Sequence, residues 1–388
     1  MKLTLEGTKQ NVVNSSTSSL SRIRLKDNSC LPGTVPIKRI TKDDLIRQIN
    51  MPPPEDVTFN AQLIADNNNS ELKGTYIASQ GYKMKPTLFR AKKKSENSST
   101  TPSSRTWLKG IGCPLGTVPI KRITKEDLIR QKSMPPSENV IFDDRWATVA
   151  IARTPINPNN KFAGGGMSAS IWNPHVEGQQ HSACRLKIQK EQDIIQVGWR
   201  VDPILYGNTQ TRLFIHFQAG KKHCFNILCP GFVIVSHEIP VDMLYDQVSH
   251  RGDNTSLEDE MGISRDLVNG NWWLLMEDNH IKVGFWPQRI FTSLTSFATD
   301  VEWGGVVYSP PGVPEPPMGS SFFPVNDTTY DAYCSGLQVL NAKGEMIDVD
   351  RVITHVDDTN LYKIVDYPHA SPGKFQHYIL YGGPGENA

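Results

Sequence analysis

The chain has 388 residues, of which 38% are hydrophobic and 8 are tryptophan. This length allows two domains, and this composition excludes a wholly disordered protein. It contains no run of about 18 consecutive apolar residues, which excludes a membrane-spanning helix. The formal net charge of +1 conceals an asymmetry, because residues 1–145 hold 24 Lys and Arg against 14 Asp and Glu, whereas residues 146–388 hold 17 against 26.

The two parts of the chain therefore carry net charges of +10 and −9. Opposite charges of this size predict that the parts bind each other. A basic tail that binds nucleic acid or a membrane surface is the alternative. Because the basic residues are scattered and not clustered, we favour self-association and expect no nucleic-acid or membrane partner. The first residues, MKLTLEGTKQNVVNSS, lack the apolar segment of a secretory signal peptide, so none is predicted there.

An internal repeat dominates the basic part. Residues 30–59 and 113–142 are identical at 22 of 30 positions, aligned without gaps. Each copy predicts an extended GTVPIKR segment followed by a short helix. In the second copy, Thr124 and Asp127 have the spacing of a capping box, in which each residue binds the backbone N–H of the other. The Met-Pro-Pro that follows predicts the end of each helix after about two turns.

From about residue 146 the sequence changes to short alternating runs separated by Gly, Pro, Asn and Asp. RLFIHFQ (212–218) alternates apolar and polar residues, as a half-buried strand does. NWWLLM (271–276) and IKVGFW (281–286) are joined by a short polar turn containing Asp278 and Asn279, which predicts a hairpin. Many short strands with almost no helical periodicity predict an all-β fold, an antiparallel β-sandwich or barrel over residues 146–388, after a small region with short helices over 1–145.

Two of the predicted strands place a polar residue two positions before a glycine. In IIQVGWRVDP (194–203), Gln196 and Gly198 share the face opposite the apolar one, and in VEWGGVVY (301–308) Glu302 and Gly304 do so. A glycine there leaves room for a ligand across the sheet. If the strands are neighbours, we expect Gln196 and Glu302 to lie within about one water's reach, roughly 3–6 Å.

A carboxylate and an amide in one groove form a workable hydrolytic pair. The glutamate can take a proton from water and return it to the leaving nitrogen. The glutamine NH₂ can donate to the oxyanion of the tetrahedral intermediate, a contribution of about 3 kcal/mol in well-measured cases. By itself this pattern is weak, because most isolated Gln or Glu residues on strands are solvated surface residues.

A longer series of segments adds weight to the pair. CPLGTVPIKRITKEDL, GWRVDPILYG, TRLFIHF, CFNILCPGFV, NWWLLM, VGFWP, VEWGG, MGS and YGGPG resemble the plant neprosin family in order and spacing, over most of residues 113–388. The resemblance implies a propeptide with the GTVPI-x-R motif and a β-sandwich catalytic domain. It also implies glutamic endopeptidase activity on the carboxyl side of proline. The two dyad glutamates of that family correspond to Glu302 and Gln196.

The glutamine at position 196 is a departure, since a Gln–Glu pair cannot share a proton as two carboxylates do. The fungal glutamic peptidases nevertheless use a Gln–Glu dyad on a related β-sandwich. We therefore expect a zymogen active at acidic pH, with Glu302 as general base and acid and Gln196 as oxyanion donor. The alternative is an inactive secreted β-sandwich protein of the same family that binds carbohydrate or peptide. The residues expected to line the substrate site are Gly198, Trp199, Tyr206, Trp303 and Gly304, although the two tryptophans also fall on apolar, core-facing sides of their strands.

The last expectations concern the cysteines, metal and cofactor binding, partners and location. Cys224 and Cys229, five residues apart, predict a disulfide that the resemblance supports. Cys184 and Cys334 have no obvious partners and are expected to be buried free thiols. No HExxH or paired CxxC spacing occurs, so neither a metal site nor a cofactor is expected. We expect a proline-containing peptide as substrate, the chain's own propeptide as partner and a monomer; the resemblance implies an extracellular or vacuolar location.

Overall fold

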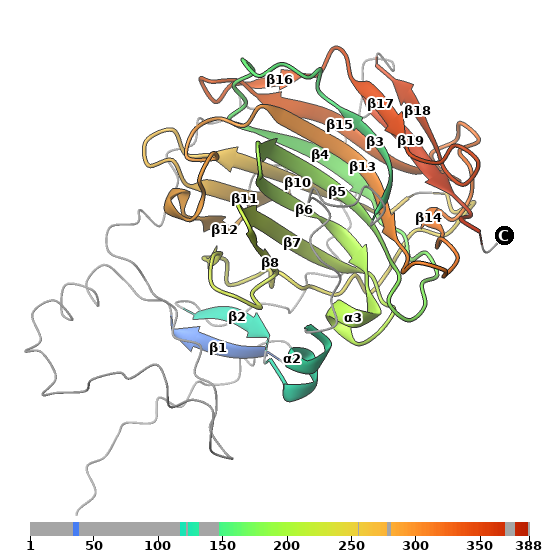
Figure 1. Ribbon diagram of the computed structural model, residues 1–388, viewed down its shortest axis with the longest axis horizontal. Coiled ribbons are helices and arrows are strands. Elements are labelled where there is room, and N and C mark those ends of the chain that lie inside the picture. Colours follow the sequence, from blue (N-terminus) through green and yellow to red (C-terminus); the bar gives the residue numbers. More distant parts are fainter. Residues whose placement is uncertain are drawn as a thin grey trace, which may run out of the picture.

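The computed structural model describes residues 34–38, 117–121, 123–131, 147–254, 256–277, 281–368 and 377–386. The described part is nearly all β (Figure 1), with two large antiparallel sheets that face each other and a separate pair of strands. This confirms the antiparallel β-sandwich predicted for residues 146–388. The predicted turn residues Asp278 and Asn279, and the helix of the first repeat, lie outside the described residues.

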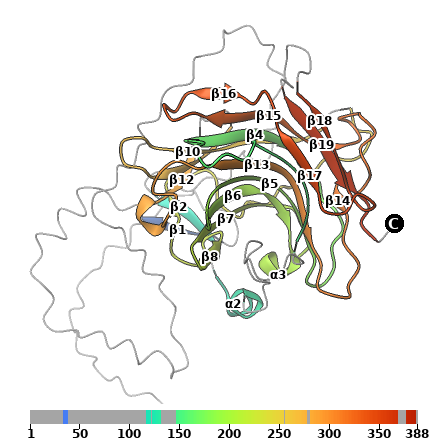
Figure 2. The same ribbon diagram turned by 45° about the horizontal axis from the view of Figure 1, so that its top comes forward.

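The seven-stranded sheet carries the candidate site. Its order is β17-β3-β13-β5-β6-β7-β8, and every neighbouring pair is antiparallel. Figure 2 shows that β5, β6 and β7 form nested arcs above the short helix α3 (Pro203–Tyr206). The strands are β17 (Ile353–Val356), β3 (Thr148–Arg153), β13 (Asp300–Tyr308), β5 (His181–Lys190), β6 (Asp193–Val201), β7 (Arg212–Ala219) and β8 (Lys222–Phe225).

The second sheet has ten strands and forms the other layer. Eight follow the order β14-β19-β15-β4-β10-β11-β12-β9, while β16 pairs with β15 and β18 with β19. The hairpin expected over residues 271–286 is confirmed, because β11 and β12 pair antiparallel with Trp272 opposite Trp286. The strands are β14 (Met318–Gly319), β19 (Tyr378–Gly383), β15 (Ala332–Leu340), β4 (Gly164–Ser170), β10 (Glu258–Arg265), β11 (Trp272–Met276), β12 (Ile281–Trp286), β9 (Val233–Ile234), β16 (Met346–Asp348) and β18 (Lys363–Tyr367).

The core lies between the sheets, where the apolar faces of the alternating strands meet. Trp199 on β6 and Trp303 on β13 are fully buried there. The Trp199 indole N–H donates to the Ser170 carbonyl at 2.9 Å, and that of Trp303 donates to the Gly166 carbonyl at 3.1 Å. Each tryptophan thus buries a large apolar ring while its one polar atom bonds to β4 of the opposite sheet.

The two copies of the repeat pair with each other. β1 (Thr34–Lys38) and β2 (Thr117–Lys121) have the same sequence, TVPIK, and run antiparallel with Pro36 opposite Pro119. A two-stranded sheet tolerates these prolines because each strand keeps an edge that needs no donor. The extended segments predicted for both copies are therefore confirmed.

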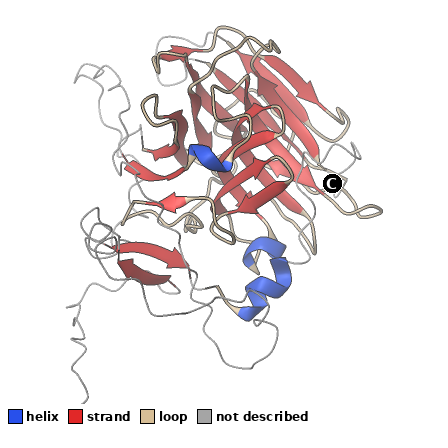
Figure 3. Cartoon of the chain, turned by 60° about the vertical axis from the view of Figure 1, so that its left-hand side comes forward, coloured by secondary structure: helices blue, strands red, loops and turns tan. Residues whose placement is uncertain are grey.

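The helix of the second copy begins with the predicted capping box. The Thr124 N–H donates to the Asp127 carboxylate at 2.8 Å, and the Asp127 N–H donates to the Thr124 hydroxyl at 3.1 Å. The helix, α2 (Lys125–Gln131), lies beside α3 (Figure 3). Its Arg130 guanidinium packs over Gly207, which ends α3. In the described part of the chain, no helix is long and apolar enough to cross a membrane.

Candidate active site

Gln196 and Glu302 lie on the same face of the seven-stranded sheet, opposite the core. The register aligns Glu302 of β13 with Lys187 of β5, and Lys187 with Gln196 of β6. The condition that their two strands be neighbours is not met, because β5 runs between them. Two strand spacings separate their backbones by about 10 Å. Any contact between the two side chains must therefore pass over β5.

Arg185 of β5 joins the two residues. Its guanidinium Nη2 donates to Glu302 Oε1 at 2.8 Å, and its Nη1 donates to Gln196 Oε1 at 3.3 Å. Lys187 Nζ lies 3.0 Å from the other carboxylate oxygen of Glu302. All of these side chains are buried. The guanidinium of Arg185 therefore holds the amide oxygen of Gln196.

Two glycines flank Arg185 on the neighbouring strands. The register places Gly304 of β13 on one side and Gly198 of β6 on the other. A Cβ at Gly198 would lie 1.8 Å from the Cys184 carbonyl oxygen, and one at Gly304 would lie 2.5 Å from that of Ala150. Gly304 also has a φ of +132°, where L-residues are strained. The backbone thus requires both glycines, because a Cβ at either position would collide with the neighbouring strand.

The two cations control the protonation of Glu302. Burial alone would raise the pKa of this carboxyl group, but the positive charges of Lys187 and Arg185, with their hydrogen bonds, lower it to about 2. The pKa of Glu302 is therefore well below that of an ordinary glutamate, which favours the ionised carboxylate at neutral pH. The arrangement is one buried carboxylate held by two buried cations, with a neutral amide on the far side of Arg185.

An aromatic group continues the same face beyond Gln196. His216 of β7 is opposite Gln196 in register, and its ring lies 4.4 Å from that of Phe225 on β8. Tyr206 of α3 packs with Phe214 and Phe225 in one buried cluster. Of the aromatic residues expected to line the substrate site, Tyr206 is therefore on the side of Gln196.

The expectation does not hold for the two tryptophans. Trp199 and Trp303 point into the core between the sheets, with no exposed surface. Successive side chains of a strand alternate between faces, so neither ring can reach a ligand beside Gln196 and Glu302.

Sequence reasoning missed Arg185 and Lys187, although a signal was present. In CRLKI (184–188) the apolar residues alternate with these two cations, and Cys184, Leu186 and Ile188 fill the core. Alternation alone places the cations on the non-core face. It does not reveal that this strand separates the strands of Gln196 and Glu302.

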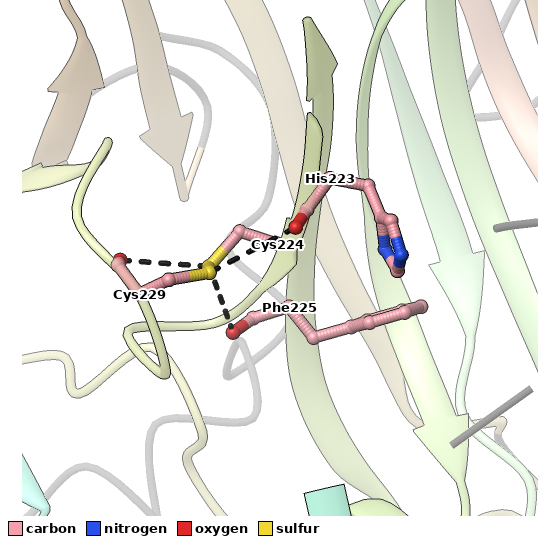
Figure 4. Close-up of a disulfide and its surroundings, with 4 residues drawn as sticks. All are labelled: His223, Cys224, Phe225 and Cys229. Carbon is pink, nitrogen blue, oxygen red and sulfur yellow. Dashed lines mark hydrogen bonds between the residues drawn. A yellow bond between two sulfur atoms is a disulfide. The ribbon is translucent and has the colours of Figure 1, made fainter. Parts of the chain in front are cut away.

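The predicted disulfide between Cys224 and Cys229 is confirmed, with Cα atoms 6.0 Å apart. It ties the end of β8 to the loop that follows. Figure 4 shows the rings of His223 and Phe225 on the side of β8 away from the sulfur atoms. The bond thus holds the edge strand that presents these rings near His216. Within the described ranges no group of three His, Cys, Asp or Glu side chains suits a metal ion.

Comparison with known proteins identifies the family. The fold is similar to that of the Scytalido-glutamic peptidase bound to a peptide-based transition-state analogue, with 12% identity and a TM-score of 0.32, over 62% of this chain and 98% of that one. The fold is also similar to that of SCP-B, a member of the Eqolisin family of peptidases, in complex with the tripeptide Ala-Ile-His, with 10% identity, a TM-score of 0.32 and the same coverage. The sequence model of the Neprosin family matches residues 178–384, more than half of the chain. The resemblance inferred from the sequence is thus confirmed, and the chain belongs to the Neprosin family.

Proposed function

We propose that this member of a peptidase family is a glutamic endopeptidase that uses Glu302 and Gln196. The observation that carries the proposal is the single guanidinium of Arg185, which bonds both side chains on one face of the sheet. It orients the carboxylate and the amide toward the same region. A peptide lying across β13, β5 and β6 would meet both groups.

In the proposed reaction, the Glu302 carboxylate takes a proton from water as the water attacks the scissile carbonyl carbon. The amide N–H of Gln196 donates to the carbonyl oxygen as it becomes an oxyanion. Protonated Glu302 then gives its proton to the leaving nitrogen, and the C–N bond breaks. Because the neighbouring cations lower the pKa of Glu302 to about 2, it is a weak base but a strong acid, so they slow the first proton transfer and favour the second.

The proposed cleavage specificity, propeptide and location follow from the family resemblance. We propose cleavage on the carboxyl side of proline, supported by the aromatic cluster of Tyr206, Phe214 and Phe225 on the side of Gln196. We propose further that residues 1–145 act as a propeptide on a monomeric zymogen. An extracellular or vacuolar location is supported by the Cys224–Cys229 disulfide, since such bonds persist in oxidising compartments.

The test is peptide hydrolysis by the purified, acid-treated chain. Proline-containing peptides are incubated at pH values from about 2.5 to about 7, a range that spans the ordinary carboxyl pKa of about 4. The products are identified by mass spectrometry. We expect cuts after proline, and a loss of about 100-fold or more in Glu302→Gln, since only the carboxylate moves protons. Unchanged turnover in a folded Glu302→Gln protein would refute the assignment.

A second function is favoured by one observation, the ion pairs that occupy both oxygens of Glu302. A carboxylate held in this way suits a β-sandwich that binds a peptide or carbohydrate without cleaving it. The same peptides decide between the two functions. Binding by calorimetry without any product, equal in wild type and Glu302→Gln, would establish the binding protein instead of the enzyme.

A further inference from the structure

Two cysteines without a disulfide face each other across the sandwich. Cys184 lies on β5 of the seven-stranded sheet and Cys334 on β15 of the ten-stranded sheet. Their sulfur atoms are 3.3 Å apart, and both side chains are completely buried. The residues are 150 positions apart in sequence, which is why spacing alone gave neither of them a partner.

The surroundings bring the sheets close together at this point. Gly305 of β13 is opposite Cys184 in register, and Ala169 of β4 is opposite Cys334. A Cβ at Gly305 would lie 2.4 Å from the sulfur of Met318 on the other sheet. A small residue thus stands on one side of each cysteine, where a larger side chain would hold the sheets apart.

We propose that Cys184 and Cys334 are the site of an inter-sheet disulfide that forms while the protein folds. The sulfur atoms need to move only from 3.3 Å to about 2.05 Å, which side-chain rotation and a small shift of the strands can supply. Immunoglobulin domains join the two sheets of a sandwich in this manner, with a tryptophan against the bond. Here Trp199 is opposite Cys184 in register.

The reaction needs an oxidant, and its timing follows from burial. The two thiols lose two electrons and two protons to a disulfide-bearing oxidoreductase, whose own disulfide becomes a dithiol, and the S–S bond forms. Burial raises the pKa of the Cys334 thiol well above its ordinary value, so Cys334 supplies little thiolate in the folded protein. Oxidation therefore precedes closure of the sandwich, and the finished bond is protected from reductants.

The bond would act on the strand that organises the candidate site. Cys184 directly precedes Arg185, which points to the opposite face of β5 and bonds both Glu302 and Gln196. A covalent tie from Cys184 to β15 fixes the position of this strand relative to the second sheet. The same tie closes a long loop and so restricts the unfolded chain.

The test is a disulfide map of the full chain made in an oxidising compartment. The protein is denatured without reductant, free thiols are blocked with N-ethylmaleimide, and peptides are identified by mass spectrometry. We expect a linked Cys184–Cys334 peptide beside the Cys224–Cys229 peptide. The latter bond is an internal control, because it reports that the sample met an oxidant.

Three results decide the matter. Label on Cys184 and Cys334 in a sample with Cys224–Cys229 oxidised would overturn the proposal, and so would linkage of either residue to Cys30 or Cys113.

A second measurement compares thermal unfolding with and without reductant. When the proteins are denatured in the presence of reductant, wild type and the double variant Cys224→Ser/Cys229→Ser should both show lower thermal stability than without reductant. The stability of Cys334→Ala should fall less. Where Cys334→Ala does not fold, the map of the wild-type chain alone decides.

Discussion

At the scale of single residues, Glu302 couples stability to pH. Its folded pKa of about 2 lies below the ordinary glutamate value of 4.5, because Lys187 and Arg185 favour the ionised form. A depressed pKa stabilises the folded state above the unfolded value, and this stabilisation disappears as pH falls through the folded value. The pH-dependent part is about 3 kcal/mol, present at pH 7 and mostly lost near pH 2.

Removing Lys187 should weaken this dependence. In Lys187→Met one cation is gone, so we expect the pKa of Glu302 to rise and the stability difference between pH 7 and pH 3 to shrink by about 1 kcal/mol. The acidic limb of the activity profile should move to higher pH by the same reasoning. Urea unfolding at both pH values measures the first effect, with Lys187→Arg as the charge-preserving control. An unchanged pH dependence in Lys187→Met would mean that the ion pair does not hold Glu302.

A substitution at Gln196 adds a second carboxylate to the site. Gln196→Glu restores the two-glutamate dyad that the family resemblance implies, and the new side chain lies where Arg185 Nη1 already donates. With two carboxylates facing two cations, we expect folding to be retained and peptide hydrolysis to be retained or raised. Gln196→Leu is the control that loses the oxyanion donor, with an expected loss of about 100-fold in kcat. Equal activity of the Glu and Leu variants would remove position 196 from the mechanism.

For these residues, the sequence predicts only what depends on local periodicity, namely the face of the strand on which each side chain lies. The alternation of each strand correctly placed Gln196 and Glu302 on the non-core face. It placed Arg185 and Lys187 there as well, but strand order depends on pairing between distant segments. The role of the two cations follows from the position of β5 between β6 and β13.

At the scale of elements, the glycines of the site are backbone requirements. Gly304 has a φ of +132° and no room for a Cβ beside the Ala150 carbonyl oxygen. Gly304→Ala should therefore destabilise the protein by about 3 kcal/mol. Gly166→Ala on β4 is the matched control, since its Cβ would meet only the Met261 carbonyl oxygen, at 3.6 Å. Chemical unfolding compares the two, and similar losses would show that the conformation of Gly304 is not the cause.

Elements with local signals were predictable and the sheets' connectivity was not. The capping box of α2 and the β11–β12 hairpin depend on residues close in sequence, and both are confirmed. The pairing of β13 with β5 joins segments more than 100 residues apart, such as Val307 with Ser182. Spacing and composition carry no information about that choice.

At the scale of the whole molecule, the contact between the repeat region and the β domain has two possible sources. The charges of +10 and −9 favour attraction, which acid and salt would weaken. The described contacts include apolar ones, because Val118 and Ile120 of β2 are buried in the same cluster as the sandwich core. Attraction of scattered surface charges is worth little for each pair, whereas each buried aliphatic side chain contributes about 2 kcal/mol. We therefore expect apolar docking to dominate.

Ile120→Asp tests this expectation against Ile123→Asp. Both variants add the same negative charge to the basic segment, but Ile120 is 8% exposed and Ile123 is 39% exposed. A charge buried without a partner should cost about 3 kcal/mol, so Ile120→Asp should release β2 while Ile123→Asp should not. Hydrogen exchange of residues 117–121 in the full chain measures release, at low and high salt. If both variants release the segment equally, or if high salt alone releases it from the wild type, the contact is electrostatic and the charge asymmetry is its cause.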